Sequence, residues 1–425
     1  MKNDRYRKRI IDAQIEKYLS VFGAICIEGP KWCGKTWTSS FHANSEIYIG
    51  DPAGNYQNRR LAQMDPSLVL AGDAPRLIDE WQEVPPLWDA VRATVDRTGQ
   101  KGQFILTGSS TPNHKGILHS GAGRIARVRM RPMSLYESGA SSGKASLSDI
   151  IHKCAPAVAT GEVKLNTLAE LIVRGGWPQN IGLPVEDAAL LPRQYIDAIL
   201  NDDVFRLDGV RRDLTKMRRL LRSLARNECT TATNKTLRRD VQEIDGSDVD
   251  TQTISAYLDI FARLFLTDDQ PPFSTSMRSS VRVKQAAKRH FCDPSLAAAL
   301  LDATPEKLMN DLNTFGFLFE ALVERDLKVY AESLGGALYH YQDYKDREID
   351  AVVELPGGDW CAVEIKLGAN EIEAAAQNLL KLADSFAEDK TARRPAALCV
   401  VCGLSNAAYE RPDGVYVVPP TALKN

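Results

Sequence analysis

The chain has 425 residues, enough for about three domains of ordinary size. Hydrophobic residues make up 44% and charged residues 25%, which is the composition of an ordinary soluble globular protein with room for a large buried core. The formal net charge is −2, which excludes a uniformly basic nucleic-acid-binding protein, so any such binding requires a local patch.

The N-terminal residues are polar and lead into no long apolar run, and no apolar stretch is long enough to span a bilayer. We therefore expect a cytoplasmic protein with no membrane partner. Among the 8 cysteines, Cys399 and Cys402 form the C-x-x-C pair. Its Val-rich surroundings predict a buried strand and reduced, structural cysteines, because a zinc site of this type normally needs a second pair.

Apolar runs alternate with helical stretches in the first part of the chain, up to about residue 137. Strands are predicted at 24–27, 46–50, 76–80 and 103–109, and helices at 10–21 and from 36 to 41. Strands that alternate with helices imply a parallel sheet wrapped by helices.

A Gly/Ser-rich stretch at 138–143 predicts a loop or domain boundary, and the chain from 168 to 265 is mostly helical. Helices are predicted there at 195–207, 214–225 and 253–264, the last of which could belong to a helix-turn-helix or winged-helix unit. The pattern of residues in the last third of the chain predicts a second α/β unit. Its helices are predicted at 316–334 and 371–386, and its strands at 338–342, 348–354, 360–366, 396–402 and 415–418.

The most informative motif follows the first predicted strand, where residues 29–36 have the Walker A pattern G-x-x-x-x-G-K-T. Backbone N–H groups of such a turn point at phosphate oxygens, Lys35 can reach the β- and γ-phosphates, and the Thr36 hydroxyl can ligate Mg²⁺. The predicted cofactors are therefore ATP and Mg²⁺; an ordinary glycine-containing turn is the alternative. The predicted nucleotide-binding residues are Gly29, Pro30, Lys31, Cys33, Gly34, Lys35, Thr36 and Trp37.

Hydrolysis also needs a carboxylate near Mg²⁺ and a group that orients water. Asp79 and Glu80 end a predicted strand, where Asp79 would hold the metal shell and Glu80 would polarise the attacking water. Ser109 ends the next strand and could sense the γ-phosphate or hold the water, and Arg124 could neutralise charge in the transition state. The alternatives are a surface Asp–Glu pair, a turn serine and a solvated arginine.

A second group of polar residues lies in the last third of the chain. Glu364 and Lys366 are two apart in a predicted strand and so share a face, and pairing with the preceding strand could bring Asp350 to them. Two carboxylates can hold Mg²⁺, and a nearby lysine can orient water or stabilise developing charge. A solvated strand face is the alternative.

These residues look like the metal-dependent nuclease core of restriction-endonuclease-like folds. The resemblance makes Asp350 and Glu364 metal ligands and Lys366 a catalytic residue. Glu320 on the preceding helix resembles the extra acid of that core, and Gln377 on the following helix resembles its supporting polar residue.

Several segments, in conserved order along nearly the whole chain, resemble one group of prokaryotic AAA-type ATPases. They are 25–38, 77–82, 106–110, 123–124, 175–178, 291–295, 316–320 and 415–419. The resemblance implies an α/β protein with a P-loop NTPase parallel sheet at 1–137. A linker and mostly helical region, with a winged-helix unit as one option, would follow at 138–310, and a nuclease-like α/β domain at 311–425.

Two basic clusters could contact DNA or RNA. Arg218, Arg222 and Arg226 share one helix face, and a basic stripe can neutralise phosphates; a solvated face paired with nearby acids is the alternative. The clusters are Arg211, Arg212, Lys216, Arg218, Arg219, Arg222 and Arg226, and Arg278, Arg282, Lys284, Lys288 and Arg289.

The leading hypothesis is an ATPase that couples nucleotide state to a nuclease-like domain acting on nucleic acid. A second hypothesis is a nucleotide-dependent switch or scaffold whose C-terminal domain binds a partner without cleavage, and a third, weaker one is a P-loop kinase for a small metabolite. A homo-oligomer is a further candidate arrangement, because Arg124 could face a neighbour's nucleotide.

Overall fold

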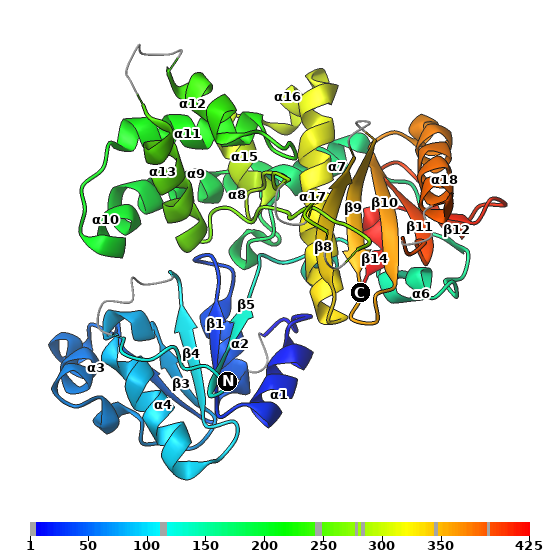
Figure 1. Cartoon of the computed structure of the whole chain (residues 1–425). Helices are drawn as coiled ribbons and strands as arrows, with labels where there is room; N and C mark the ends of the chain where they lie inside the picture. Colours follow the sequence, from blue (N-terminus) through cyan, green and yellow to red (C-terminus); the bar gives the residue numbers. More distant parts are fainter. Residues whose placement is uncertain are drawn as a thin grey trace.

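The computed structural model describes residues 6–110, 117–242, 249–276, 279–281, 285–343, 347–388 and 392–425. Figure 1 shows an N-terminal α/β unit, a mostly helical region beside one end of its strands, and a C-terminal sheet with its helices. In the described part of the chain, no helix combines the length and apolar character that a membrane span requires.

The N-terminal unit is a parallel sheet with the strand order β2-β3-β4-β1-β5, which confirms the predicted fold class. Its strands are β1 (Ala24–Glu28), β2 (Ser45–Tyr48), β3 (Arg76–Asp79), β4 (Phe104–Gly108) and β5 (Ile125–Arg129). Its helices are α1 (Asp12–Val21), α2 (Lys35–His42), α3 (Ala53–Met64) and α4 (Pro86–Thr98). The last strand, β5, was not predicted, because apolar and basic residues alternate in it over only five positions.

Both faces of this sheet are covered, which explains the continuous apolar run of β1. Ile25 and Ile27 pack with Ile15 of α1 on one face, whereas Cys26 packs with Trp88 of α4 on the other. Successive strand residues point to opposite faces, so a strand buried on both sides needs an apolar residue at every position.

The middle of the chain is helical, as predicted. Its helices include α7 (Leu165–Arg174), α8 (Val185–Ala188), α9 (Leu190–Ala198), α10 (Val204–Asp208), α11 (Leu214–Arg226), α12 (Asn234–Gln242), α13 (Thr251–Arg263), α15 (Pro294–Leu300) and α16 (Pro305–Asn310). A π-helical turn, η5 (Ile199–Asp203), joins α9 to α10. After α13, antiparallel bridges pair Thr267 with Phe291 and Gln270 with Lys288. This order, three helices and then a hairpin, is the one that a winged-helix unit would have, and the winged-helix option stays a prediction.

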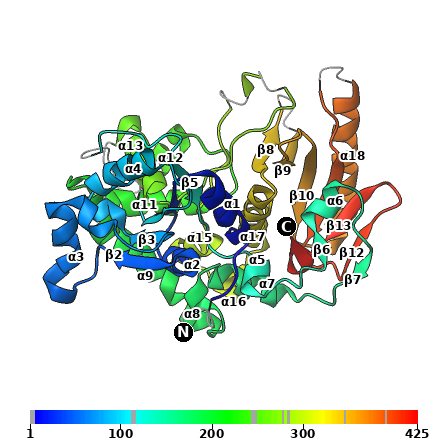
Figure 2. The ribbon, with the colours of Figure 1, turned by 90° about the horizontal axis from the view of Figure 1, so that it is seen from below.

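The C-terminal sheet lies between two long helices, with α17 (Leu312–Ser333) and α18 (Ile372–Glu388) on opposite faces (Figures 1 and 2). Val353 and Val363 face Leu322 of α17, and Val352 and Ala362 face the other side with α18. The sheet order is β7-β12-β13-β11-β10-β9-β8. The strands are β7 (Val158–Ala159), β8 (Ala337–Gln342), β9 (Glu348–Glu354), β10 (Trp360–Lys366), β11 (Ala397–Cys402), β12 (Ala407–Glu410) and β13 (Val415–Val418).

Part of the segment expected to be a linker belongs to the C-terminal sheet region. β7 pairs with β12 and is itself the edge strand of the sheet, and β6 (Ala145–Ser146) pairs with β14 (Leu423–Lys424). In Figure 2, β6 and β7 lie next to β12 and β13 at the C-terminal sheet. Strands of two residues carry no periodicity, and their partners are more than 240 positions away, so local sequence could not predict the pairing.

Candidate functional sites

The loop after β1 requires glycine at both of its motif positions. Gly29 has φ +153°, and a Cβ atom there would lie 2.1 Å from the Met130 carbonyl oxygen. Gly34 has φ +104° and begins α2 in a left-handed conformation. The Lys35 ammonium donates to the carbonyl oxygens of Gly29 (3.0 Å) and Pro30 (2.8 Å), so the lysine lies along the loop.

The two residues predicted to hold Mg²⁺ here lie together. The Thr36 hydroxyl donates to Asp79 Oδ1 over 3.0 Å, and Thr107 donates to the same oxygen over 2.6 Å. Adjacent ligands of an octahedral Mg²⁺ with bonds of 2.0–2.1 Å lie about 2.9 Å apart. The Thr36–Asp79 spacing therefore fits one edge of that octahedron, and Mg²⁺ would supply charge neutralisation for the phosphates.

Glu80 and Ser109 also lie together, in the arrangement a water-polarising carboxylate requires. Ser109 Oγ donates to Glu80 Oε2 over 3.1 Å, and Gln82, which the sequence analysis missed, donates to the same carboxylate. Burial raises the pKa of Glu80, while Lys35 partly opposes the rise. Glu80 also has φ 56° and ψ 48°, a left-handed conformation that is costly for a residue with a Cβ atom.

The other predicted loop residues are spread more widely. Lys31 forms an ion pair of 2.5 Å with Asp203 of η5, so it links the loop to the helical region. Cys33 is fully buried, and its carbonyl accepts from Arg9 over 2.9 Å. The Trp37 side chain is 55% exposed and lies outside the residues that line the adjacent cavity.

A cavity of about 600 Å³ lies between the N-terminal unit and the helical region. Lys31, Glu80 and Ser109 line it from one side and Asp203 and Arg206 from the other. Within the described part of the chain, the Arg206 side chain has no hydrogen-bond or ion-pair partner. Arg206 could not be predicted from the sequence, because it lies about 170 positions from the loop on a helix without a motif.

Arg124 does not reach the nucleotide loop of its own chain. Its carbonyl accepts from Ala24 N, at the start of β1, whereas the loop follows the end of that strand, about 16 Å away for five extended residues. The Arg124 guanidinium pairs with Asp96 over 2.6 Å, and its side chain is 49% exposed. Of the two arrangements considered, the structure places Arg124 away from the loop of its own chain, and a role at a neighbour's nucleotide stays a prediction.

In the C-terminal unit, Asp350 and Glu364 converge on Lys366. The Lys366 ammonium lies 3.1 Å from Asp350 Oδ2 and 2.8 Å from Glu364 Oε2. The pairing of β9 with β10 brings the acids to one side, and the Ile365 N–H donates to Asp350 Oδ2 over 2.7 Å. Burial and the Asp350 charge raise the pKa of Glu364 to about 7. The two carboxylates fit a divalent cation, whose charge would offset this burial.

Glu320 lies beside this group but contacts a cation of the chain. Lys288, on the hairpin of the helical region, donates to Glu320, to Glu324 over 3.1 Å and to the Asp350 carbonyl oxygen over 3.0 Å. Burial raises the pKa of Glu320 to about 8, with Lys288 opposing and Asp350 adding to the rise. Lys288 is therefore buried among acids, and the expectation that it belongs to a surface basic cluster is wrong.

The supporting polar residue on α18 is Asn378 and not Gln377. Asn378 Nδ2 donates to Glu364 Oε1 over 2.8 Å, whereas Gln377 is exposed and contacts Glu373 over 3.4 Å. Neighbouring helix positions point about 100° apart, so an error of one residue moves the side chain from the site to solvent.

The basic clusters are largely paired with acids. In the first cluster, four of the arginines lie within ion-pair distance of an acid, which favours the alternative of a solvated, neutralised helix face. These pairs are Arg212–Asp208, Arg218–Asp197, Arg222–Asp302 and Arg226–Asp240. In the second cluster Arg289 pairs with Asp269, and Arg278, Arg282 and Lys284 lie outside the described residues.

Comparison with protein families defines the N-terminal unit. Residues 22–139 match the model of an AAA domain, and residues 165–307 and 315–423 match models of two domains of unknown function, DUF8612 and DUF4143. Together with the glycine loop on a parallel sheet, the first match shows that this unit is a P-loop ATPase domain of the AAA type.

Individual proteins resemble the chain over most of its length. Uncharacterized proteins of Mycobacterium bovis and Mycobacterium tuberculosis are each 26% identical to it over 354 residues, which is 82% of this chain and 72% of theirs. Among solved structures, a Walker-type ATPase of Pyrococcus abyssi is 11% identical, with a TM-score of 0.39. That alignment covers 70% of this chain and 97% of the Pyrococcus chain.

Proposed function

We propose that the chain binds and hydrolyses ATP with Mg²⁺ at the loop after β1. The observation that carries this proposal is the convergence of Thr36, Asp79 and Glu80 beside the Lys35 loop. Lys35 and the loop amides would hold the phosphates, Thr36 and Asp79 the metal, and Glu80 would take part in activating water, with Ser109 orienting its carboxylate. We propose that the protein is located in the cytoplasm. A homo-oligomer is a candidate arrangement.

Arg206 is our candidate for the cationic side chain that neutralises charge in the transition state. It lines the cavity opposite Glu80 and has no competing partner among the described residues. A guanidinium supplied within the chain, from the helical region, would make hydrolysis depend on how that region sits over the loop.

The Lys31–Asp203 ion pair offers a route from nucleotide state to the rest of the chain. Lys31 lies in the loop that would hold the phosphates, and Asp203 lies in a π-helical turn of the helical region. Phosphate oxygens would compete with Asp203 for the same ammonium group. ATP binding would then loosen this contact, and product release would restore it.

Two substitutions test the ATPase proposal. Lys35→Ala should abolish ATP binding measured by calorimetry, because it removes the charge that meets the β- and γ-phosphates. Glu80→Gln should keep binding but lower ATP turnover by about 10²- to 10⁴-fold, since it removes the general base. Glu16→Gln, on the exposed face of α1, is the control. Unchanged turnover in both Lys35→Ala and Glu80→Gln would place the chemistry elsewhere.

We further propose that the C-terminal unit cleaves phosphodiester bonds of DNA or RNA with a divalent metal. The supporting observation is the Asp350–Lys366–Glu364 group, held by Asn378. The competing function is a scaffold that binds a partner without cleavage, and the buried Lys288 next to Glu320 favours it, because an internal cation already offsets that acid.

A cleavage assay separates these two functions. The purified chain is incubated with DNA and with RNA in Mg²⁺ or Mn²⁺, with and without ATP. A nuclease should cut, Lys366→Ala should not, and Lys381→Ala, on the exposed face of α18, should cut like the original chain. No cleavage by the original chain under all of these conditions would favour the scaffold.

A further inference from the structure

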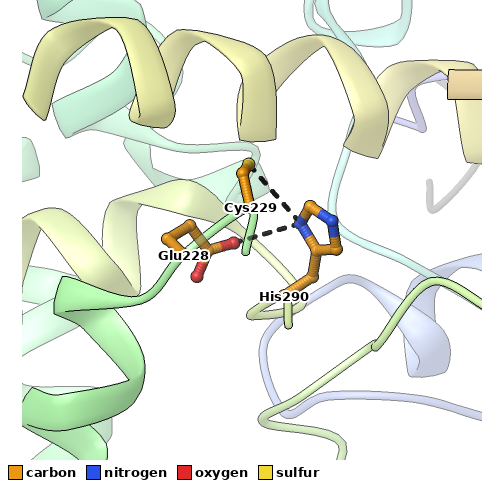
Figure 3. A group of neighbouring side chains, drawn as sticks. All are labelled: Glu228, Cys229 and His290. Carbon is orange, nitrogen blue, oxygen red and sulfur yellow. Dashed lines mark hydrogen bonds and ion pairs between the residues drawn. The ribbon is translucent and has the colours of Figure 1, made fainter. Parts of the chain in front are cut away.

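Figure 3 shows a buried group of potential metal ligands, none of which lines the cavity beside the glycine loop. Glu228 and Cys229 follow α11. His290 lies nearby, on the second strand of the hairpin after α13. All three residues are buried. Backbone hydrogen bonds fix the two segments, since Cys229 N donates to Arg289 O over 2.9 Å and Arg289 N to Thr230 O over 2.8 Å. The donor atoms are therefore carried on rigid backbone.

The spacing of the donor atoms fits a tetrahedral metal. His290 Nδ1 lies 3.2 Å from Glu228 Oε1 and 3.9 Å from Cys229 Sγ (Figure 3). In a tetrahedral zinc site, with bonds near 2.0 Å to nitrogen and oxygen and 2.3 Å to sulfur, these edges are about 3.3 and 3.5 Å. The two measured edges each lie within a few tenths of an ångström of those values.

The surroundings of His290 also match a metal ligand. Its second nitrogen, Nε2, lies 2.9 Å from Glu324 Oε2 on α17 and 3.1 Å from Gln270 Oε1. With a metal bound, these acceptors would hold the proton on Nε2, and the lone pair of Nδ1 would be available to the ion. A carboxylate behind the imidazole is the usual outer partner of a metal-bound histidine.

We propose that Glu228, Cys229 and His290 bind one structural zinc ion. A thiolate, an imidazole and a carboxylate in a tetrahedral, buried setting suit Zn²⁺ better than Mg²⁺ or Ca²⁺, which take oxygen ligands. The Cys229 thiol also donates to the Phe317 carbonyl oxygen of α17 over 3.3 Å, so the group adjoins that helix. Such an ion would join the hairpin and the α11 loop to the long helix of the C-terminal unit.

The competing explanation needs no metal. A protonated His290 between Glu228 and Glu324 accounts for the same short contacts, with Cys229 as a buried thiol that donates to Phe317 O. Zinc binding would displace the thiol proton and the proton on Nδ1. The two explanations therefore differ in metal content and in the state of the sulfur, both of which can be measured on the whole chain.

The first experiment uses the full chain without substitutions. Elemental analysis after purification without chelators should find about one zinc per chain. Removal of the ion by a strong chelator should lower the melting temperature, and adding Co²⁺ to this stripped protein should produce thiolate-to-cobalt charge-transfer absorption. A folded chain that carries no zinc, takes up none and gives no such absorption with Co²⁺ would overturn the proposal.

Two cysteine variants locate the site. Cys229→Ala should lose the zinc and the cobalt absorption, whereas Cys292→Ala, which changes a buried cysteine two residues from His290 and outside the group, should keep both. Circular dichroism establishes that each variant is folded. Zinc retained by folded Cys229→Ala would exclude the proposed ligand set. ATP binding is measured in parallel, so that failure of the metal proposal is distinguishable from loss of the nucleotide site.

Discussion

At the scale of single residues, a few residues of the proposed nucleotide site have backbone conformations or surroundings that cost free energy of folding. Glu80 adopts a left-handed backbone conformation, Gly29 lies where no Cβ atom fits, and Lys35 is buried with its ammonium on loop carbonyls. Strained conformations of this kind persist only where the surrounding structure determines them, as at sites that must position reacting groups. The lysine contacts are those that phosphate oxygens would replace.

Arg206 and Arg124 provide a matched pair of substitutions at this scale. Arg206→Ala should lower ATP turnover on the order of 10³-fold, because it removes the guanidinium that faces the cavity. Arg124→Ala should leave turnover of the monomeric chain unchanged, since Arg124 lies at the far end of the sheet. Steady-state turnover at saturating ATP checks both. Equal losses in the two variants would point to an arginine acting between copies.

At the scale of elements, the hairpin after α13 connects the helical region to the C-terminal sheet. The Gln270 side chain donates to Tyr339 O on β8, Phe273 N donates to His340 O, and His340 N donates to Pro271 O. Lys288 and His290 point from the same hairpin to Glu324 on α17. The hairpin is therefore the structural link through which changes at the ATP loop could reach the C-terminal site.

His340 makes the stability of this link depend on pH. The side chain is buried, and its Nε2–H donates to Ala286 O over 3.1 Å. Burial lowers its pKa to about 4, with Lys288 and His290 adding to the decrease and the Ala286 carbonyl and Glu324 opposing it. Between pH 6.5 and about 4, the unfolded chain binds a proton that the folded chain does not, so the stabilising contribution is lost as pH falls through that range.

We expect His340→Gln to remove this part of the acid sensitivity. Chemical denaturation at pH 7, 5.5 and 4.5 should show the free energy of unfolding of the original chain falling more steeply than that of the variant. The difference should reach a few kcal/mol at most, since one pKa unit corresponds to about 1.4 kcal/mol. Parallel pH profiles for the two proteins would show that His340 titrates normally.

At the scale of the whole molecule, the three regions of the sequence contact one another and are not structurally independent. Asp326 of α17 accepts from Leu135 N over 2.8 Å, and Arg131 pairs with Asp268 over 2.7 Å. The strands β6 and β7 come from residues before the helical region yet pair with strands at the C-terminal end. The C-terminal unit is therefore completed by a segment that precedes the helical region.

Truncation tests this dependence. A fragment of residues 138–425 should give a cooperative thermal transition, because it keeps β6 and β7 with their partners. A fragment of residues 311–425 should aggregate or melt at a temperature lower by about 5 °C or more, since β12 becomes an uncovered edge. Size-exclusion chromatography and thermal scans compare the two. An equally stable, monomeric short fragment would show that β6 and β7 are dispensable.

The sequence alone was sufficient for features set by neighbouring residues. The apolar runs and their spacing predicted the parallel sheet, the helical middle and most strands of the C-terminal sheet, because burial of a strand or helix face requires a local pattern. The glycine loop with Lys35 was also recognisable, since its backbone conformation needs particular residues at consecutive positions. Asp79 and Glu80 were proposed for the same reason, from their place at the end of a strand.

Only the tertiary structure determined which distant side chains meet. It placed Arg206 at the cavity beside the glycine loop and Arg124 at the opposite end of the sheet, and it selected Asn378 in place of Gln377. It also brought Lys288 to Glu320 and joined β6 and β7 to the C-terminal end. These contacts depend on the packing and rotation of elements that are far apart in the chain. They therefore cannot be predicted from the local pattern of hydrophobic residues.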